Sequence, residues 1–174
     1  MCFCVVIACK SKLQTDGMAG TGLCGFHCLS QCLTGNQGSY RDVIEDCIGV
    51  FQNIPELFRL RTNFGSRHDS LMTLEDYRSF MNDAVSRVDA GLKIDTDAWC
   101  EDGHFAAITL LYDIAIFTYS LVNKQWQVFN ECARGGYVTL LSLPGHFDLL
   151  TGLNRAPEIP HGAHTHGVTR NTYD

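Results

Sequence analysis

Residues 20–29 read GTGLCGFHCL, and this stretch carries the strongest chemical signal in the chain. Closely spaced glycines precede Cys24, and cysteines recur after it at helical spacing, at Cys28 and Cys32. A glycine-rich loop that runs into a helix turns backbone N–H groups toward one point, and those of the first helical turn have no intrahelical acceptor. Such groups can lower the pKa of a thiol and stabilise an oxyanion. Cys24 is therefore a candidate nucleophile, and a third buried thiol in a helical apolar stripe is the alternative.

The composition limits the class of protein. The chain has 174 residues, of which 45% are hydrophobic and 18% are charged, and this predicts one globular domain. Its formal net charge is −6 and its Lys and Arg residues form no cluster, so nucleic acid is not an expected partner. Nine cysteines cannot all pair, and a chain of this length needs no disulfides, which favours a reducing compartment such as the cytoplasm.

No apolar run reaches the roughly 18 residues that span a bilayer, so we expect no membrane segment. The opening MCFCVVIACK is short and lacks the basic region and cleavage site of a signal peptide. It predicts a buried strand over residues 2–10.

Helical periodicity dominates the first two thirds of the chain. A helix is predicted from Cys24 to a stop at Gly35, a second after a capping pattern at Ser39, and a third after the capping residues Thr73 and Asp76. Apolar spacing through residues 105–111 predicts one more helix.

Short runs rich in β-branched and aromatic residues follow and predict strands at 114–119, 126–129, 137–143 and 147–150. Gly135 and Gly136 predict a hairpin turn between two of them. Residues 155–174 have no apolar periodicity, so the domain is expected to end at Asn154 and a flexible tail to follow, whose removal should not affect folding.

GTGLCGFHCL resembles the nucleophile motif of the ovarian tumour (OTU) cysteine proteases, a Gly-Asp-Gly-Asn-Cys segment followed by aromatic and basic residues. Cys24 takes the nucleophile position, and Phe26 and His27 take the aromatic and basic positions. Thr21 stands where the motif has Asp, and Leu23 where it has Asn. Neither departure removes a backbone N–H.

Two later segments match the family in the required order. Residues 99–102 (WCED) resemble the start of its Trp-led helix, and residues 145–148 (GHFD) resemble the His-aromatic-Asp element that closes the catalytic site. The likeness is closest to compact viral and transposon-borne members. It implies a papain-like α/β (α+β) fold, in which helices flank a small, mostly antiparallel central sheet.

The resemblance implies that Cys24 is the nucleophile and His146 its general base. Asp148 lies two residues beyond His146, so on a strand both side chains lie on one face and the carboxylate can orient the imidazole. Asp16, in the glycine-rich segment, is the alternative orienting acid. The backbone N–H groups of Thr21 and Cys24 are the expected oxyanion donors, with the Leu23 amide as an alternative.

Other histidines are weaker candidates. His27 lies three residues after Cys24 but takes the position of an inert basic residue, and His104 fits a solvated helix start. His161, His164 and His166 lie in the tail without a rigid element or a Cys or carboxylate partner, so no metal site is predicted.

The resemblance implies hydrolysis after the C-terminal glycine of ubiquitin, with ubiquitin-like modifiers as further substrates. The reaction needs no cofactor. We expect a monomer in the cytoplasm, or in the host cytosol if the chain is viral. Two alternatives stay open: a protease that processes a viral or transposon polyprotein, and a catalytically decayed ubiquitin-binding module.

Overall fold

The structure is a computed structural model of the chain and describes residues 14–18, 20–60, 72–94, 98–151, 157 and 164–166. Helices occupy the first part of the chain and most strands follow. The helices are α1 (Cys24–Thr34), α2 (Tyr40–Asn53), α3 (Pro55–Leu60), α4 (Leu74–Asp89) and α5 (Asp102–Tyr112), with a 3-10 helix η1 (Gln37–Ser39) before α2. The strands are β1 (Gln14–Asp16), β2 (Ala115–Ser120), β3 (Gln125–Phe129), β4 (Tyr137–Leu143), β5 (His146–Thr151) and β6 (His164–His166).

The described strands form one six-stranded sheet in the order β1-β5-β4-β2-β3-β6. Antiparallel pairs join β1 to β5, β5 to β4, and β2 to β3. Parallel pairs join β2 to β4 and β3 to β6, so the sheet is mixed. The α/β fold class is confirmed, and the predicted helices and the four predicted strands agree with the structure to within one to three residues at most ends.

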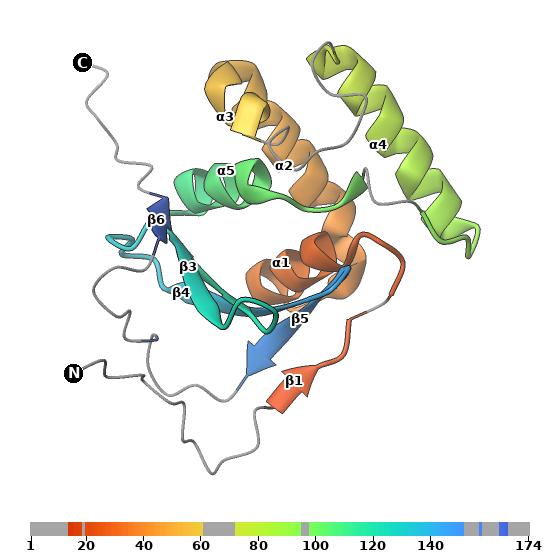
Figure 1. The fold of residues 1–174 in the computed structure, drawn as a ribbon. Coiled ribbons are helices and arrows are strands. Elements are labelled where there is room, and N and C mark those ends of the chain that lie inside the picture. The colour runs from red at the N-terminus through yellow and green to blue at the C-terminus, as the bar shows by residue number, and fades with distance from the viewer. Residues whose placement is uncertain are drawn as a thin grey trace, which may run out of the picture.

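The main apolar core lies between the sheet and the helices. Figure 1 shows α1 and α5 against the sheet, with α2, α3 and α4 beyond them. Ile116, Leu140 and Leu149 point from one face of the sheet into the core that the helices share. A smaller buried cluster includes Phe117 and Val128. Along their strands these residues alternate with residues of the main core, so they lie on the opposite face of the sheet. No described helix is both long and apolar enough to cross a bilayer.

The two predicted capping patterns have different outcomes. At the start of α4, the Asp76 N–H donates to Thr73 Oγ1 and the Thr73 N–H donates to the Asp76 carboxylate, which confirms the capping box. At the start of α2, the Ser39 side chain makes no capping hydrogen bond, so that prediction is wrong. Ser39 already belongs to η1, whose own start is capped by Asn36, and the chain enters α2 from that turn.

The predicted hairpin turn at Gly135 and Gly136 is also wrong. β3 and β4 lie on opposite sides of β2, so the segment between them crosses the end of β2. There the Gly135 N–H donates to the Asp113 carbonyl at 2.8 Å, and a Cβ on Gly135 would lie 2.8 Å from that same oxygen. Gly135 is therefore needed for a close approach between two backbones rather than for a hairpin.

The predicted tail contributes to the sheet. Residues 164–166 form β6 and pair in parallel with residues 127–129 of β3 at the edge of the sheet. Chain composition cannot reveal this pairing, because an edge strand of three residues needs no apolar periodicity. The predicted strand at 2–10 and the predicted domain end at Asn154 lie outside the described residues.

Candidate active site

Cys24 is the first residue of α1, directly after a tight loop. Gly22 has a φ of +95°, which glycine adopts without strain, and Leu23 caps the helix without a side-chain hydrogen bond. A Cβ on Gly22 would lie 2.6 Å from Cγ1 of Ile94. The loop therefore requires glycine at position 22 both for its backbone angle and for its packing.

The first turn of α1 packs closely against the segment that precedes α5. A Cβ on Gly25 would lie 2.4 Å from Cβ of Cys100, so only glycine allows this approach. Cys24 and Cys28 are buried, as the apolar stripe predicts, but Cys32 is exposed and does not belong to the core. The six cysteines in the described part of the chain form no disulfide with one another.

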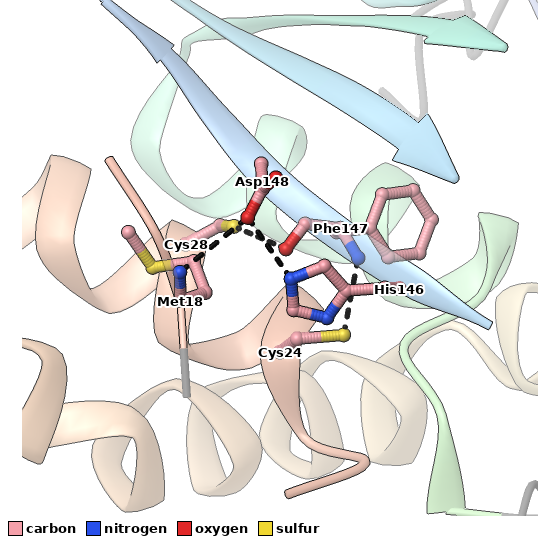
Figure 2. Close-up of polar contacts among 6 residues, drawn as sticks. All are labelled: Met18, Cys24, Cys28, His146, Phe147 and Asp148. Atoms are coloured by element: carbon pink, nitrogen blue, oxygen red, sulfur yellow. Dashed lines mark hydrogen bonds and ion pairs between the residues drawn. The ribbon is translucent and has the colours of Figure 1, made fainter. Parts of the chain in front are cut away.

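His146 and Asp148 lie on β5, where alternation places both side chains on one face of the strand. Nε2 of His146 lies 2.9 Å from Oδ1 of Asp148. Because a carboxylate only accepts, Nε2 carries the proton, and Nδ1 is left to accept. Figure 2 shows Nδ1 on the side of the imidazole that faces Sγ of Cys24.

Asp148 is itself held in place by the backbone. The Met18 N–H donates to the same oxygen, Oδ1, at 3.4 Å. Met18 lies between β1 and the nucleophile loop, so this bond connects the acid to the segment that leads into Cys24 (Figure 2).

The peptide groups of Phe147 connect β5 to the Cys24 and Cys28 thiols of α1 (Figure 2). The Phe147 N–H donates to Sγ of Cys24 at 3.2 Å, and Sγ of Cys28 donates to the Phe147 carbonyl at 3.6 Å. Cys24 and Cys28 are one helical turn apart, so one contacts the N–H and the other the carbonyl of the same strand residue. Strand β5 and helix α1 are thereby fixed to each other beside His146 and Cys24.

The prediction of a lowered pKa for Cys24 is wrong as long as no cation lies beside its thiol. Burial raises the pKa of Cys24, and this effect exceeds the lowering by the N–H groups of Phe147, Gly25 and Cys24 itself. The negative charge of Asp148 also raises the Cys24 pKa slightly. A buried thiolate at this position therefore needs a nearby cation, and a protonated His146 would supply one.

The structure brings Cys24, His146 and Asp148 together, and of the alternative acid it describes the backbone only. Asp16 belongs to β1, where its backbone lies opposite Leu149, and its side chain lies outside the described part of the chain. Asp148 is therefore the acid that the described geometry places on the imidazole. Its role in turnover stays a prediction.

The backbone N–H groups of the loop differ in whether they can donate to an oxyanion. The Leu23 N–H donates to Oγ1 of Thr21 at 3.3 Å, so the alternative oxyanion donor is already engaged. The Cys24 N–H belongs to the first turn of α1, where helix geometry provides no intrahelical acceptor. Thr21 and Cys24 as oxyanion donors stay a prediction.

The prediction that His104 lies in a solvated helix start is wrong, because its side chain is fully buried. Its Nδ1 accepts from the Glu101 N–H at 3.0 Å, and its Nε2 lies 2.6 Å from the Tyr77 hydroxyl. This imidazole caps α5 and packs among aromatic rings, which is a structural role. Among the described residues, no group of three or more His, Cys, Asp or Glu side chains could hold a metal ion.

Comparisons with known proteins bear on the fold of the chain. No family model and no curated protein matches the sequence. The solved OTU domain of OTUD1 superposes with a TM-score of 0.53 at 15% identity, over 79% of this chain and 85% of that one. The OTU protease of Qalyub virus superposes with a TM-score of 0.53 at 14% identity, over 80% of this chain and 83% of that one. An OTU domain solved in complex with ubiquitin gives 0.54 at 18% identity, over 80% of this chain and 69% of that one.

This chain has the OTU fold. The fold that the three motifs implied is confirmed, and it is shared with both a cellular and a viral domain. At these identities the likeness concerns the fold, so the chemistry of this chain rests on its own site residues.

Three features of this candidate site could not be read from the sequence. The N–H groups of Met18 and Phe147 are backbone donors, which every non-proline residue carries, so residue type gives no signal for them. The contact of Cys28 with the Phe147 carbonyl depends on where α1 meets β5. The glycine at position 25 was the one available signal, because a glycine inside a predicted helix often marks a close approach.

Proposed function

We propose that this chain is a cysteine-type deubiquitinase that hydrolyses the bond after the C-terminal glycine of ubiquitin. The observation that carries the proposal is the arrangement of Cys24 at the start of α1 beside the His146–Asp148 pair on β5. The OTU fold and the solved OTU domain in complex with ubiquitin support ubiquitin as the partner. Ubiquitin-like modifiers are the closest alternative substrates.

Acylation begins when Nδ1 of His146 accepts the thiol proton of Cys24. The thiolate Sγ then attacks the carbonyl carbon of the C-terminal glycine, and the carbonyl oxygen becomes an oxyanion. The N–H groups of Cys24 and Thr21 stabilise this oxygen, while the Phe147 N–H stabilises the thiolate before attack. The imidazolium of His146 next gives its proton to the leaving lysine amine.

Deacylation reuses the same residues. His146 accepts a proton from water, the resulting hydroxide attacks the thioester carbon, and the carbon–sulfur bond breaks with Cys24 leaving as a thiolate. The imidazolium of His146 returns its proton to this thiolate, which regenerates the thiol and the neutral imidazole. Asp148 accepts from Nε2 throughout, which keeps the imidazole in the tautomer and orientation that both steps need. No redox change occurs, and no cofactor is required.

A ubiquitin whose C-terminus carries a thiol-reactive electrophile tests the proposal directly. It should label the chain once, and Cys24→Ala should abolish both labelling and turnover of a ubiquitin conjugate. Cys32→Ala is the matched control, because Cys32 lies on the same helix and is more exposed than Cys24. Its labelling and turnover should equal those of the unchanged protein, and labelling that survives in Cys24→Ala would contradict the proposal.

The same assay separates the two alternatives. Cleavage of a peptide substrate without cleavage of any ubiquitin conjugate would indicate a polyprotein-processing protease. Binding of ubiquitin without labelling or turnover would indicate a decayed binding module.

A further inference from the structure

The loop before Cys24 is held by Thr21 through three separate contacts. Its hydroxyl oxygen accepts from the Leu23 N–H at 3.3 Å, and its carbonyl accepts from the Ile94 N–H at 3.2 Å. The same hydroxyl oxygen lies 3.3 Å from Nε2 of His27, on the next turn of α1. Thr21 thus connects the loop to a side chain that the catalytic steps do not use.

The hydrogen-bond pattern around His27 assigns its tautomer. Nδ1 lies 3.1 Å from the Gln37 carbonyl, and since a carbonyl only accepts, Nδ1 carries the proton. Burial lowers the pKa of His27, so the neutral ring is favoured. Nε2 then accepts, and the Thr21 hydroxyl donates to it. The donors run in one direction, from Leu23 N–H to Thr21 O–H to His27, and from His27 N–H to Gln37.

The ring of His27 has little freedom to move. Its centroid lies 4.4 Å from that of Tyr40, and both side chains are buried. The imidazole is therefore a fixed acceptor for the Thr21 hydroxyl, anchored on η1 through Gln37 and on α2 through Tyr40. In the OTU motif the positions of Thr21 and His27 carry Asp and a basic residue. In this chain a hydrogen bond between two neutral side chains joins Thr21 and His27.

We propose that His27 is a positioning residue, which acts through the Thr21 hydroxyl to hold the loop whose backbone N–H groups receive the oxyanion. Loss of the Thr21 hydroxyl or of the His27 imidazole weakens the hydrogen bond of the Leu23 N–H. The N–H groups of the Gly20–Leu23 loop can then point in other directions. This role rests on the proposed function, because the oxyanion forms only in acyl transfer. The thiol and its base are not part of it.

Two pairs of variants test the proposal. His27→Gln keeps an acceptor near Nε2 and so retains the bond to Thr21, whereas His27→Asn keeps a group near Nδ1 and loses that bond. Thr21→Ser keeps the hydroxyl, whereas Thr21→Val keeps the shape and loses it. We expect kcat on a ubiquitin–fluorophore substrate to fall by about 10- to 100-fold in His27→Asn and Thr21→Val, with KM little changed. His27→Gln should stay within about threefold of the unchanged protein, and Thr21→Ser should lose clearly less kcat than Thr21→Val.

Alkylation of Cys24 by iodoacetamide separates positioning from general damage. This substitution needs the thiolate but no oxyanion hole, so its rate should be the same in all four variants. Thr34→Val is the matched control, since it removes a hydroxyl that donates to the Ser30 carbonyl at the other end of α1. It should lower the melting temperature without changing kcat.

Two further results decide the proposal. The double variant Thr21→Val with His27→Asn should lose no more kcat than either single variant, because both break one link. Hydrogen exchange at the Leu23 amide should be about tenfold faster in Thr21→Val and His27→Asn than in the other proteins. Equal kcat in His27→Gln and His27→Asn, or additive losses in the double variant, would overturn the proposal. If the unchanged protein cleaves no ubiquitin conjugate, the proposed function fails, and exchange at Leu23 alone decides whether His27 holds the loop.

Discussion

At Cys24, two effects of the surrounding residues oppose each other. Burial of the side chain raises the pKa of the thiol, and three backbone N–H groups lower it, with burial the larger effect. A free thiol in this environment is a weak nucleophile at neutral pH. We expect the imidazole of His146 to make it reactive, because an imidazolium beside the thiolate offsets the cost of burying the charge.

Iodoacetamide alkylation as a function of pH tests this dependence. In the unchanged protein, Cys24 should react at neutral pH and faster than the exposed Cys32. In His146→Ala the order should reverse at pH 7, since the thiolate fraction of Cys24 grows only as pH rises through its raised pKa. A His146→Ala protein whose Cys24 still reacts faster than Cys32 at pH 7 would show that the N–H groups suffice.

Asp148 accepts two hydrogen bonds on one oxygen, since its Oδ1 accepts from both His146 and the Met18 N–H. Asp148→Asn can still accept from the imidazole but stabilises its cation less, so kcat should fall by roughly 10- to 1,000-fold. Asp16→Asn is the comparison and should change kcat little. The reverse order of effects would move the third role of the triad to Asp16.

At the scale of elements, the close contact of α1 with its neighbours positions Cys24. Gly25 allows α1 to lie against Cys100 on one side and Phe147 of β5 on another. Phe147 in turn packs edge-on against Phe105 of α5, with ring centroids 5.5 Å apart. The site therefore depends on three packed elements rather than on one flexible loop.

Alanine substitutions at two helical glycines measure this packing. Gly25→Ala should destabilise the protein by about 1–3 kcal/mol, because its Cβ would overlap Cys100. Gly49→Ala, in α2, meets nothing within 4 Å and should stabilise by about 0.5–1 kcal/mol through helix propensity. Urea unfolding of both variants gives the two values. Similar changes for both would mean that α1 can move away from Cys100 without cost.

At the scale of the whole molecule, the candidate catalytic residues lie at β5, away from β6. Cys24 contacts β5, which is separated from β6 by β4, β2 and β3. Strand β6 covers the edge of β3, and an uncovered edge is a site for unwanted pairing with other chains.

Deletion after Asn154 tests this separation of stability from activity. Without β6, the melting temperature should fall by several degrees and self-association should increase, because the backbone edge of β3 is exposed. kcat on a ubiquitin–fluorophore substrate should stay within about twofold at a temperature where the truncated protein is folded. A truncated protein with an unchanged melting temperature would restore the expectation of a dispensable tail.

The sequence by itself determined the local structure and the identity of the chemical groups. Apolar spacing predicted the helices, the Thr73–Asp76 capping box marked one start, and alternation placed His146 and Asp148 on one face of a strand. These features depend on neighbouring residues in the chain. The order of the three motifs then indicated the fold, and it named Cys24, His146 and Asp148 as the residues that meet.

Only the tertiary structure decided what depends on residues far apart in the chain. The path from β3 across β2 to β4, the exposure of Cys32, and the raised pKa of Cys24 all follow from how the elements pack. Backbone donors such as the Phe147 N–H are present in every sequence, and only the fold selects which of them points at a thiol. Burial and hydrogen bonding between distant segments are properties of the packed chain, so local periodicity cannot reveal them.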